Sequence, residues 1–387
     1  MSHLMNTYAR LPLAFTHGEG SWLWDAEGKR YLDALSGIAV NTLGHAHPRF
    51  TATLSAQVGR LIHVSNVYRI TEQERLSDKL AQLSSMDEVF VCNSGCEANE
   101  AAIKLARMYG HHKGVELPNI IVMEKSFHGR TLATLSATGN RKVQAGFEPL
   151  VPGFVRVAYD DLAAVRQVAE HNPNVVAVLV EPIQGEGGIR TPDVSYLQGL
   201  RQICDQHGWL LMLDEVQSGI GRTGKWFTHQ HAGILPDVMT LAKGLGSGVP
   251  VGACLAAGKA TGTFKPGNHG STFGGNPLAC TAALTTLEVM EQDNLLAHAA
   301  AIGAQIRDGL QQRLGAAVQV RGQGLMIGIE LGRPCGELVK LALERGLLIN
   351  VTADSVVRLL PPLVFSADEA AQLLDLLCPL IEDFLKS

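Results

Sequence analysis

Long basic runs and long apolar runs are both missing from this sequence. Its 387 residues carry a formal net charge of -5 at pH 7, and no apolar stretch reaches the ~18 residues that a membrane-spanning helix needs. Proteins whose main partner is nucleic acid or an anionic membrane usually concentrate Lys and Arg in a patch or tail. We therefore expect neither nucleic acid nor a membrane to be the main partner.

Signals for secretion and for paired cysteines are also missing. The first ten residues lack the apolar core of a signal peptide, and the seven cysteines include no Cys-x-x-Cys pair. Cys92 and Cys96 lie four residues apart, beside a glycine. We expect all seven cysteines to be reduced thiols of a cytoplasmic protein.

The spacing of metal ligands is absent as well. His45-Ala-His47 and His229-Gln-His231 each place two imidazoles on alternate residues, which share a face on a strand. No third or fourth ligand follows at a recognisable spacing. We therefore predict that the protein has no metal site.

What the sequence does contain is enough apolar material for a large core. It is 46% hydrophobic and 18% charged, and it is long for a single core. Neither repeats nor low-complexity linkers interrupt it. We predict a large domain over residues 61–275 and a small C-terminal domain over residues 276–387, with an N-terminal segment, residues 1–60, packed on the small domain.

The middle of the chain alternates between short apolar runs and helical patterns. This alternation predicts an α/β fold, with a mostly parallel seven-stranded sheet and helices on both faces. The strand candidates are Glu88–Cys92, Ile120–Met123, Val155–Ala158, Val175–Val180, Leu210–Leu213, Val238–Leu241 and Ala253–Ala256.

The pattern changes after about Asn276, and it predicts a smaller α+β domain. A long Ala/Leu-rich helical stretch runs to about Gly315. Short strand candidates follow at Leu325–Glu330, Leu348–Val351 and Val356–Leu360. A last helix opens at Ser366, where Glu369 completes a capping box.

Lys243 is the most informative single residue. It follows one predicted buried strand, and Asp214 directly follows another. Ligands of open α/β sheets bind at the carboxyl ends of the strands, so the amine and the carboxylate should meet at one site. Pyridoxal phosphate chemistry needs that pair, because an amine forms the Schiff base and a carboxylate keeps the pyridine nitrogen protonated.

The segment Cys92–Arg107 is a candidate phosphate site. It follows a predicted strand and opens a helix, with Ser94 and Glu97 at capping-box spacing and Gly95 between them. A phosphate there would accept backbone N–H groups and gain from the helix dipole. An ordinary capped helix explains the same residues, and on these residues alone it is the better interpretation.

Three more groups of residues lie at or near predicted strand ends. Phe127 could stack on a flat heteroaromatic ring and Arg130 could bind a carboxylate, but on these residues alone a core Phe and a surface Arg are the better interpretation. Glu186 lies in a glycine-rich turn that a solvated loop also explains. Arg358 lies in an apolar run, where a charged residue either faces outward or meets an anion.

The segment Gly219–Gly224 matches the dinucleotide fingerprint G-x-G-x-x-G. That fingerprint joins a strand directly to a helix, whereas Asp214–Ser218 intervene here and the following segment has poor helical periodicity. The same segment begins like a P-loop, but Trp226 replaces the required Ser or Thr. We interpret it as a glycine-rich loop and keep a nicotinamide-dependent oxidoreductase as the alternative from a different class.

Taken together, the motifs resemble those of the class III pyridoxal-phosphate aminotransferases, which have the fold called type I. The matching segments are Gly20–Asp25, Leu43–Pro48, Asn93–Ala101, Ser126–Thr131, Glu181–Gly188, Leu213–Gln217, Ala242–Gly244 and His269–Pro277. The resemblance thus spans nearly the whole chain. Cys96 departs from it, since relatives usually have a small residue there, but little is lost if the backbone N–H binds the phosphate.

The resemblance implies a role for each candidate residue. Lys243 and Asp214 would be catalytic: the lysine binds the cofactor covalently and then moves the proton, and the aspartate pairs with the ring nitrogen. The implied cofactor-binding residues are Gly95, Cys96, Phe127, Asp214, Glu215, Val216, Gln217, Lys243 and Thr272 of the partner subunit. The implied substrate-binding residues are Arg130, Ser271, Glu186 and Arg358.

The resemblance also implies pyridoxal 5'-phosphate as cofactor and a homodimer with its sites at the subunit interface. It is strongest to members that move the side-chain amino group of N-acetylornithine to 2-oxoglutarate in arginine biosynthesis. Ornithine, succinylornithine, succinyldiaminopimelate and 4-aminobutyrate remain alternative donors. A cofactor-less binding protein is disfavoured, because both Lys243 and Asp214 are retained.

Likeness to ornithine-type relatives further predicts a gate. Arg358 would bind the α-carboxylate of glutamate, which lies next to the reacting amine. Glu186 would neutralise Arg358 while a donor without that carboxylate is bound, because an unpaired buried charge is costly. The alternative is that Glu186 is a surface turn residue and Arg358 a solvated strand residue.

Overall fold

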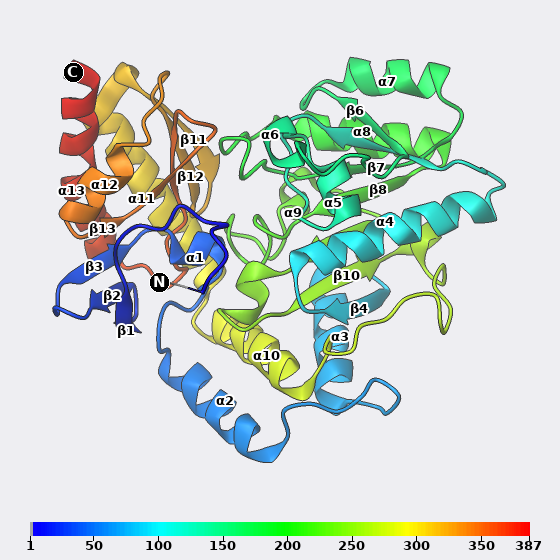
Figure 1. Ribbon diagram of the computed structural model, residues 1–387, viewed down its shortest axis with the longest axis horizontal. Helices are drawn as coiled ribbons and strands as arrows, with labels where there is room; N and C mark the ends of the chain where they lie inside the picture. Colours follow the sequence, from blue (N-terminus) through cyan, green and yellow to red (C-terminus); the bar gives the residue numbers. More distant parts are fainter. Residues whose placement is uncertain (1–2) are drawn as a thin grey trace.

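The computed structural model describes residues 3–387, and its larger part is built on a seven-stranded sheet in the order β4-β10-β9-β8-β7-β5-β6 (Figure 1). Neighbouring strands are parallel except around β10, which is antiparallel to β4 and β9. The predicted fold class is confirmed. The strands are β4 (Glu88–Cys92), β5 (Asn119–Met123), β6 (Phe154–Val157), β7 (Val175–Val180), β8 (Leu210–Asp214), β9 (Val238–Leu241) and β10 (Gly252–Ala256).

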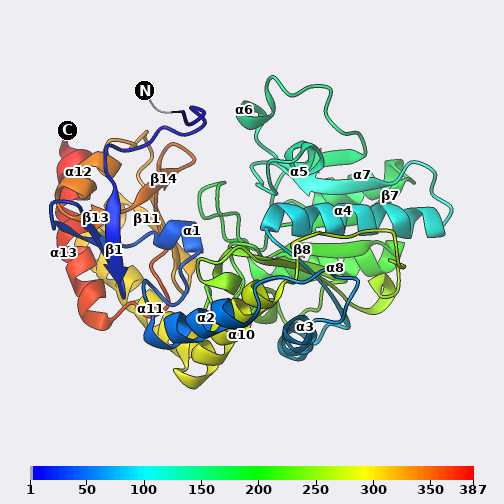
Figure 2. The same ribbon diagram turned by 60° about the horizontal axis from the view of Figure 1, so that its bottom comes forward.

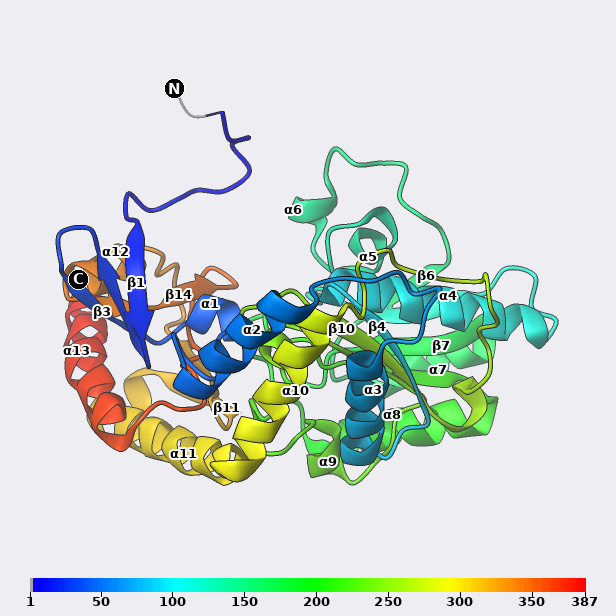
Figure 3. The same cartoon turned by 90° about the horizontal axis from the view of Figure 1, so that it is seen from below.

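Helices cover both faces of this sheet because its inner strands are apolar on both sides. In β5, Ile120 and Val122 pack under α4 (Gly95–His112) and α5 (Leu132–Ala137), while Ile121 and Met123 pack on the other face against α7 (Leu162–His171) and α8 (Val194–His207) (Figure 3). The short helices of this region are α6 (Arg141–Gln144), α9 (His229–Ala232), η1 (Lys243–Gly246) and η2 (Gly258–Ala260).

The C-terminal region carries a second sheet in the order β11-β12-β15-β14. Its elements are η3 (Gly315–Ala317), β11 (Gln319–Gln323), β12 (Met326–Glu330), α12 (Leu338–Glu344), β14 (Asn350–Thr352), β15 (Val356–Leu359) and α13 (Ala367–Lys386), which has the predicted capping box. The single strand predicted at Leu348–Val351 is wrong. It is divided into β13 (Leu347–Leu348) and β14, which belong to different sheets.

The helical stretch predicted to run unbroken to Gly315 is also two elements, α10 (Pro277–Gln292) and α11 (Leu295–Leu314). Asn294 between them has φ 52°, a left-handed conformation that asparagine tolerates better than most residues. The break lets α10 pack on α2 (Pro48–Arg60) and α3 (Thr71–Ser84) and contact η1, where Lys243 lies, while α11 packs on α13 (Figure 1).

The N-terminal segment forms a third sheet, β1 (Phe15–Glu19), β2 (Trp22–Asp25) and β3 (Arg30–Asp33), completed by β13 from the C-terminal region (Figure 2). Between this sheet and β4 lie α1 (Ser36–Ala39), α2 (Pro48–Arg60), which packs on α10, and α3 (Thr71–Ser84). The parallel pairing of β3 with β13 supports an N-terminal segment joined to the small domain, and the domain boundaries themselves stay a prediction. Within residues 3–387, no helix combines the length and apolarity that crossing a membrane requires.

Candidate active site

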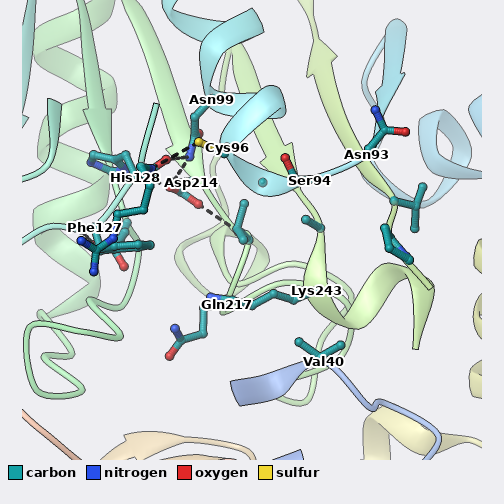
Figure 4. Close-up of a pocket in the computed structure, with 18 of the residues that line it drawn as sticks. Val40, Asn93, Ser94, Cys96, Asn99, Phe127, His128, Asp214, Gln217 and Lys243 are labelled. Atoms are coloured by element: carbon teal, nitrogen blue, oxygen red, sulfur yellow. Dashed lines mark hydrogen bonds and ion pairs between the residues drawn. The ribbon is translucent and has the colours of Figure 1, made fainter. Parts of the chain in front are cut away.

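The carboxyl ends of β4, β5, β8 and β9 meet around one cavity of about 400 Å³ (Figure 4). Its walls include Ser94, Cys96, Phe127, Asp214, Gln217 and Lys243. These strands run parallel to one another, so the side chains that follow them collect at the same edge of the sheet. The structure therefore brings the lysine and the aspartate to a shared cavity.

Asp214 is the last residue of β8, and its side chain is buried. Its Oδ2 accepts hydrogen bonds from His128 Nδ1 and Asn99 Nδ2, each at 2.8 Å, and its Oδ1 accepts one from the backbone N–H of Val216 at 3.0 Å. Figure 4 shows both side chains converging on the carboxylate. This set of donors holds a negative charge in place inside the cavity wall.

Lys243 is the first residue of the short helix η1, and only Ala242 separates it from the end of β9. Its backbone has φ 43°, a conformation that few residues other than glycine adopt, and Thr42 Oγ1 donates to the next carbonyl, that of Gly244, at 2.8 Å. Burial lowers the pKa of the Lys243 ammonium, although the carboxylate of Glu186 acts in the opposite direction. A lowered pKa increases the share of neutral amine, which is the nucleophilic form.

The helix α4 begins at Gly95, with Ser94 as its N-cap. Ser94 Oγ accepts a hydrogen bond from the N–H of Glu97 at 3.1 Å. The N–H groups of Gly95 and Cys96 belong to the first turn and have no acceptor within the helix, so they are available to bind an anion. A Cβ at Gly95 would meet the side chain of Val216 at 2.7 Å, so a larger residue does not fit there. These features suit a phosphate.

The thiol of Cys96 is already engaged away from those amides. The N–H groups of Arg130 and Thr131 donate to Sγ at 3.3 and 3.4 Å, and the hydroxyl of Thr134 lies 3.2 Å from it. The thiol therefore fastens α4 to the turn that carries Arg130. The backbone of Cys96 stays free to bind phosphate, so the departure from the usual small residue does not disturb the predicted anion site.

Phe127 and Arg130 line both this cavity and an adjoining one of about 1120 Å³. The guanidinium carbon of Arg130 lies 5.6 Å from the centre of the Phe127 ring. The N–H of Phe127 donates to Glu181 Oε1 at 2.9 Å, which fixes the start of the turn. Burial raises the pKa of Glu181 to about 7.

The predicted ion pair between Glu186 and Arg358 is present, with Glu186 Oε1 2.6 Å from Arg358 Nη1. Arg358 lies on β15 and is completely buried; it also donates to Asn350 Oδ1 at 3.1 Å and to Gln217 Oε1 at 3.3 Å. Burial acts to raise the pKa of Glu186, but the charge and the hydrogen bond of Arg358, together with Lys243 and Gln217, outweigh burial and lower that pKa. Gln217 lines the first cavity and Glu186 the second, so the pair lies between them.

Besides Glu186 and Arg358, three predicted site residues do not line the first cavity. The carboxylate of Glu215 accepts the N–H groups of Thr228 (2.6 Å) and His229 (2.9 Å) and so organises the following loop. Ser271 Oγ accepts from Asn93 Nδ2 at 3.1 Å, outside the cavity wall, and Thr272 is exposed. The assignment of Thr272 to the site of the partner subunit stays a prediction.

The two His-x-His pairs and the Gly219–Gly224 loop make hydrogen bonds within the fold. The four histidines of the two His-x-His pairs are engaged separately, His45 with Asp33, His47 with the N-terminus of α2, His229 with Glu215 and His231 with Thr223. The Gly219–Gly224 loop opens no helix, and the guanidinium of Arg222 in it donates to the carbonyls of Leu325 and Pro361. That loop therefore ties the large sheet to the C-terminal region.

Sequence reasoning missed three buried residues around Asp214, namely His128, Asn99 and Thr240. Thr240 Oγ1 donates to Asn99 Oδ1 at 2.8 Å, which links all three to the carboxylate. One signal was available for Asn99, which lies one helical turn after Gly95 and so faces the same side of α4. His128 follows Phe127 directly, but nothing in the sequence shows which way its ring points.

A lysine and a buried, hydrogen-bonded aspartate that face one cavity beside a helix N-terminus are the groups that a pyridoxal-phosphate enzyme needs, for the covalent bond, the ring nitrogen and the phosphate respectively. The family model for class-III aminotransferases matches residues 4–381. The chain belongs to the class-III aminotransferases, and pyridoxal phosphate is the cofactor of this family.

Among its curated relatives is the acetylornithine aminotransferase of Nitrosomonas europaea, 63% identical over 100% of this chain and 99% of that protein. A solved acetylornithine aminotransferase from Elizabethkingia anophelis is 36% identical, with a TM-score of 0.89 over 99% of this chain and 97% of that one. An ornithine aminotransferase from Toxoplasma gondii, solved with partial occupancy of pyridoxal phosphate at its active site, is 33% identical, with a TM-score of 0.95 over 100% of this chain and 93% of that one.

Proposed function

We propose that this enzyme transfers the side-chain amino group of N-acetylornithine to 2-oxoglutarate, as a step of arginine biosynthesis in the cytoplasm. The similarity to acetylornithine aminotransferases supports the donor. The observation that carries the proposal is the ion pair between Glu186 and Arg358, which lies next to the cavity that Lys243 and Asp214 share. This pair gives one site the means to accept two unlike substrates.

The chain's own residues divide the work between binding and proton movement. Bound pyridoxal phosphate supplies an electron sink for the negative charge that develops at the substrate carbon. The Lys243 amine would hold the cofactor covalently and afterwards move a proton at its Nζ. Asp214 would pair with the ring nitrogen, Phe127 would pack on the ring, and the N–H groups of Gly95 and Cys96 would hold the phosphate.

Arg130 and Arg358 serve different carboxylates. Acetylornithine presents its side-chain amine to the reacting centre and has its carboxylate far away, where Arg130 lies exposed at the junction of the two cavities. Glutamate presents its α-amine and therefore brings one carboxylate near, which needs a second cation. Arg358 supplies that cation once Glu186 moves away, and the glycines on both sides of Glu186 leave room for the movement.

Replacing Glu186 with Ala is expected to change the preference between substrates. Without its partner, Arg358 is open to any α-carboxylate, so the glutamate half-reaction should be kept or accelerated. The acetylornithine half-reaction should slow by roughly tenfold or more, because a buried guanidinium then lacks a counter-charge while this donor is bound. Single-turnover absorbance measurements of each half-reaction check this, with Asp375→Ala, which removes a carboxylate paired with Arg313 between α11 and α13, as the matched control. Equal effects of Glu186→Ala on both half-reactions would contradict the proposal that Glu186 neutralises Arg358 only while acetylornithine is bound.

The amino donor is tested by comparing kcat/KM across acetylornithine, ornithine, succinylornithine, succinyldiaminopimelate and 4-aminobutyrate with 2-oxoglutarate as acceptor. We expect acetylornithine to be preferred over ornithine and 4-aminobutyrate by about tenfold or more, the ratio that 1.4 kcal/mol of differential binding produces. A higher kcat/KM with any other donor would replace acetylornithine in the proposal while keeping the aminotransferase class.

A homodimer with its sites at the subunit interface is also part of the proposal. The loop that carries Thr272 is next to exposed apolar side chains, since Asn66 donates to the carbonyls of Ser271 and Gly274, and Val67 and Phe273 are 80% and 64% exposed. A second subunit that covers these side chains supports the role predicted for Thr272 at the site of the partner subunit.

A further inference from the structure

The two oxygens of Asp214 carry unequal numbers of hydrogen bonds. A carboxylate oxygen has two lone pairs, and both lone pairs of Oδ2 are used, one by Asn99 Nδ2 and one by His128 Nδ1. Among residues 3–387, which the structure describes, Oδ1 accepts only the N–H of Val216. Of the two oxygens, Oδ1 is therefore the one with capacity for a further donor.

The orientation of the Asn99 amide is fixed by its surroundings. Its Nδ2 lies 2.8 Å from the carbonyl oxygen of His128 and 2.8 Å from Asp214 Oδ2, and both of these atoms can only accept. The NH₂ end must therefore face them, which turns Oδ1 of Asn99 toward the hydroxyl of Thr240 at 2.8 Å. Since Oδ1 can only accept, Thr240 has to donate, and the hydrogen bonds have one consistent direction from Thr240 to Asp214.

Thr240 lies on β9, directly beside Asp214 on β8. The two residues are partners in the parallel pairing of β8 and β9, so their side chains project from the same face, over which α4 lies. Thr240 is completely buried and Asn99 is 1% exposed, so no water competes for these groups. A buried hydroxyl and amide that are fully paired hold their geometry firmly.

We infer that Thr240 and Asn99 are positioning residues that, together with His128, saturate Oδ2 of Asp214 and reserve Oδ1 for the ring nitrogen of the cofactor. The inference rests on the proposed pairing of Asp214 with that nitrogen. Oδ1 is the oxygen that makes the pairing, and Thr240 and Asn99 act on it through Asp214. We call Thr240, Asn99 and His128 the Asp214 clamp.

Thr240→Val is the sharpest test, because it removes the hydroxyl and keeps the shape. Asn99 Oδ1 then lacks a donor in a buried place, and the amide holds Asp214 less firmly. We expect kcat to fall by roughly threefold to tenfold, the range set by one neutral hydrogen bond, with KM nearly unchanged. Thr240→Ser, which restores a hydroxyl, should recover most of the loss. Thr286→Val is the matched control, since Thr286 is equally buried but donates to the carbonyl of Ala282 within α10.

The second variant, Asn99→Asp, replaces the donor by a carboxylate 2.8 Å from Asp214 Oδ2. Two carboxylates at that distance cannot both stay charged, so the charge opposite the ring nitrogen is reduced. We expect a loss in kcat of about 100-fold, larger than that of Thr240→Val.

The readout that separates positioning from stability is the NMR signal of ¹⁵N-labelled pyridoxal phosphate in the holoenzymes, which reports protonation of the ring nitrogen. Thr240→Val and Asn99→Asp should move this signal toward the unprotonated form, and Thr240→Ser and Thr286→Val should not. The clamp is overturned if Thr240→Val leaves the signal and kcat equal to those of Thr286→Val while Asp214→Asn shifts the signal. If Asp214→Asn leaves the signal in place, the pairing and the clamp fail together.

Discussion

Replacing Lys243 with Ala is expected to abolish turnover while weak binding of pyridoxal phosphate survives. The lysine combines two tasks at one atom, the covalent attachment of the cofactor and the movement of a proton, and no other lysine lines the cavity within the described residues 3–387. We expect kcat to fall by at least about 10⁴-fold, the upper range for loss of a general base, with the loss of the nucleophile added to it. The phosphate site at Gly95 and Cys96 and the packing of Phe127 remain and account for the residual affinity.

Steady-state rates with acetylornithine and 2-oxoglutarate check this expectation, and titration of the apoprotein with pyridoxal phosphate measures the residual affinity. Lys225→Ala is a suitable control, because Lys225 is exposed and donates to a backbone carbonyl in the glycine-rich loop away from the cavity. A Lys243→Ala enzyme that retains a tenth of the original rate would exclude Lys243 from the chemistry.

Asp214→Asn is expected to cost about 10²- to 10³-fold in kcat and much less in cofactor affinity. The asparagine can keep its carbonyl oxygen toward Asn99 and His128, which both donate hydrogen bonds there. Its NH₂ group then occupies the position of Oδ1. That group donates where an acceptor is needed, so the ring nitrogen loses the charge that keeps it protonated and the electron sink weakens.

The measurement is a pair of numbers for the same variant, kcat from steady-state rates and the dissociation constant of pyridoxal phosphate from titration of the apoprotein. Asp214→Glu is the companion variant, because it keeps the charge and displaces it, and it should lie between the wild type and Asp214→Asn in kcat. If Asp214→Asn lowers kcat and cofactor affinity by the same factor, Asp214 supports the cavity and has no selective effect on the chemistry.

The large sheet could be predicted closely from the sequence because its strands are buried on both faces. Such strands appear as unbroken apolar runs, and Val175–Val180 and Val238–Leu241 were located with their true bounds. Strands that are exposed on one side or broken by turns gave no such signal, so β1 to β3 and β11 were not predicted. The division of Leu348–Val351 depends on Ile349, whose neighbours pair with strands in two different sheets.

The residues of the site also differ in how well they could be predicted from the sequence. Lys243 and Asp214 follow recognisable strands, so their position at one edge of the sheet follows from topology alone. The pairing of Glu186 with Arg358 was predicted from the resemblance to ornithine-type relatives and from the glycine-rich turn that carries Glu186. Thr240 and Asn99 have no such signal, because a buried hydroxyl and a buried amide acquire a role only through the partners that the folded chain places beside them.

The most direct test of the account is to reduce the holoenzyme with borohydride and to map the modified peptide by mass spectrometry. Reduction fixes the bond between the cofactor and the amine that holds it. We expect the adduct on Lys243, in the segment Ala242–Gly244 after β9. An adduct on Lys125, which lines the adjoining cavity, or on Lys225, in the glycine-rich loop, would contradict this expectation.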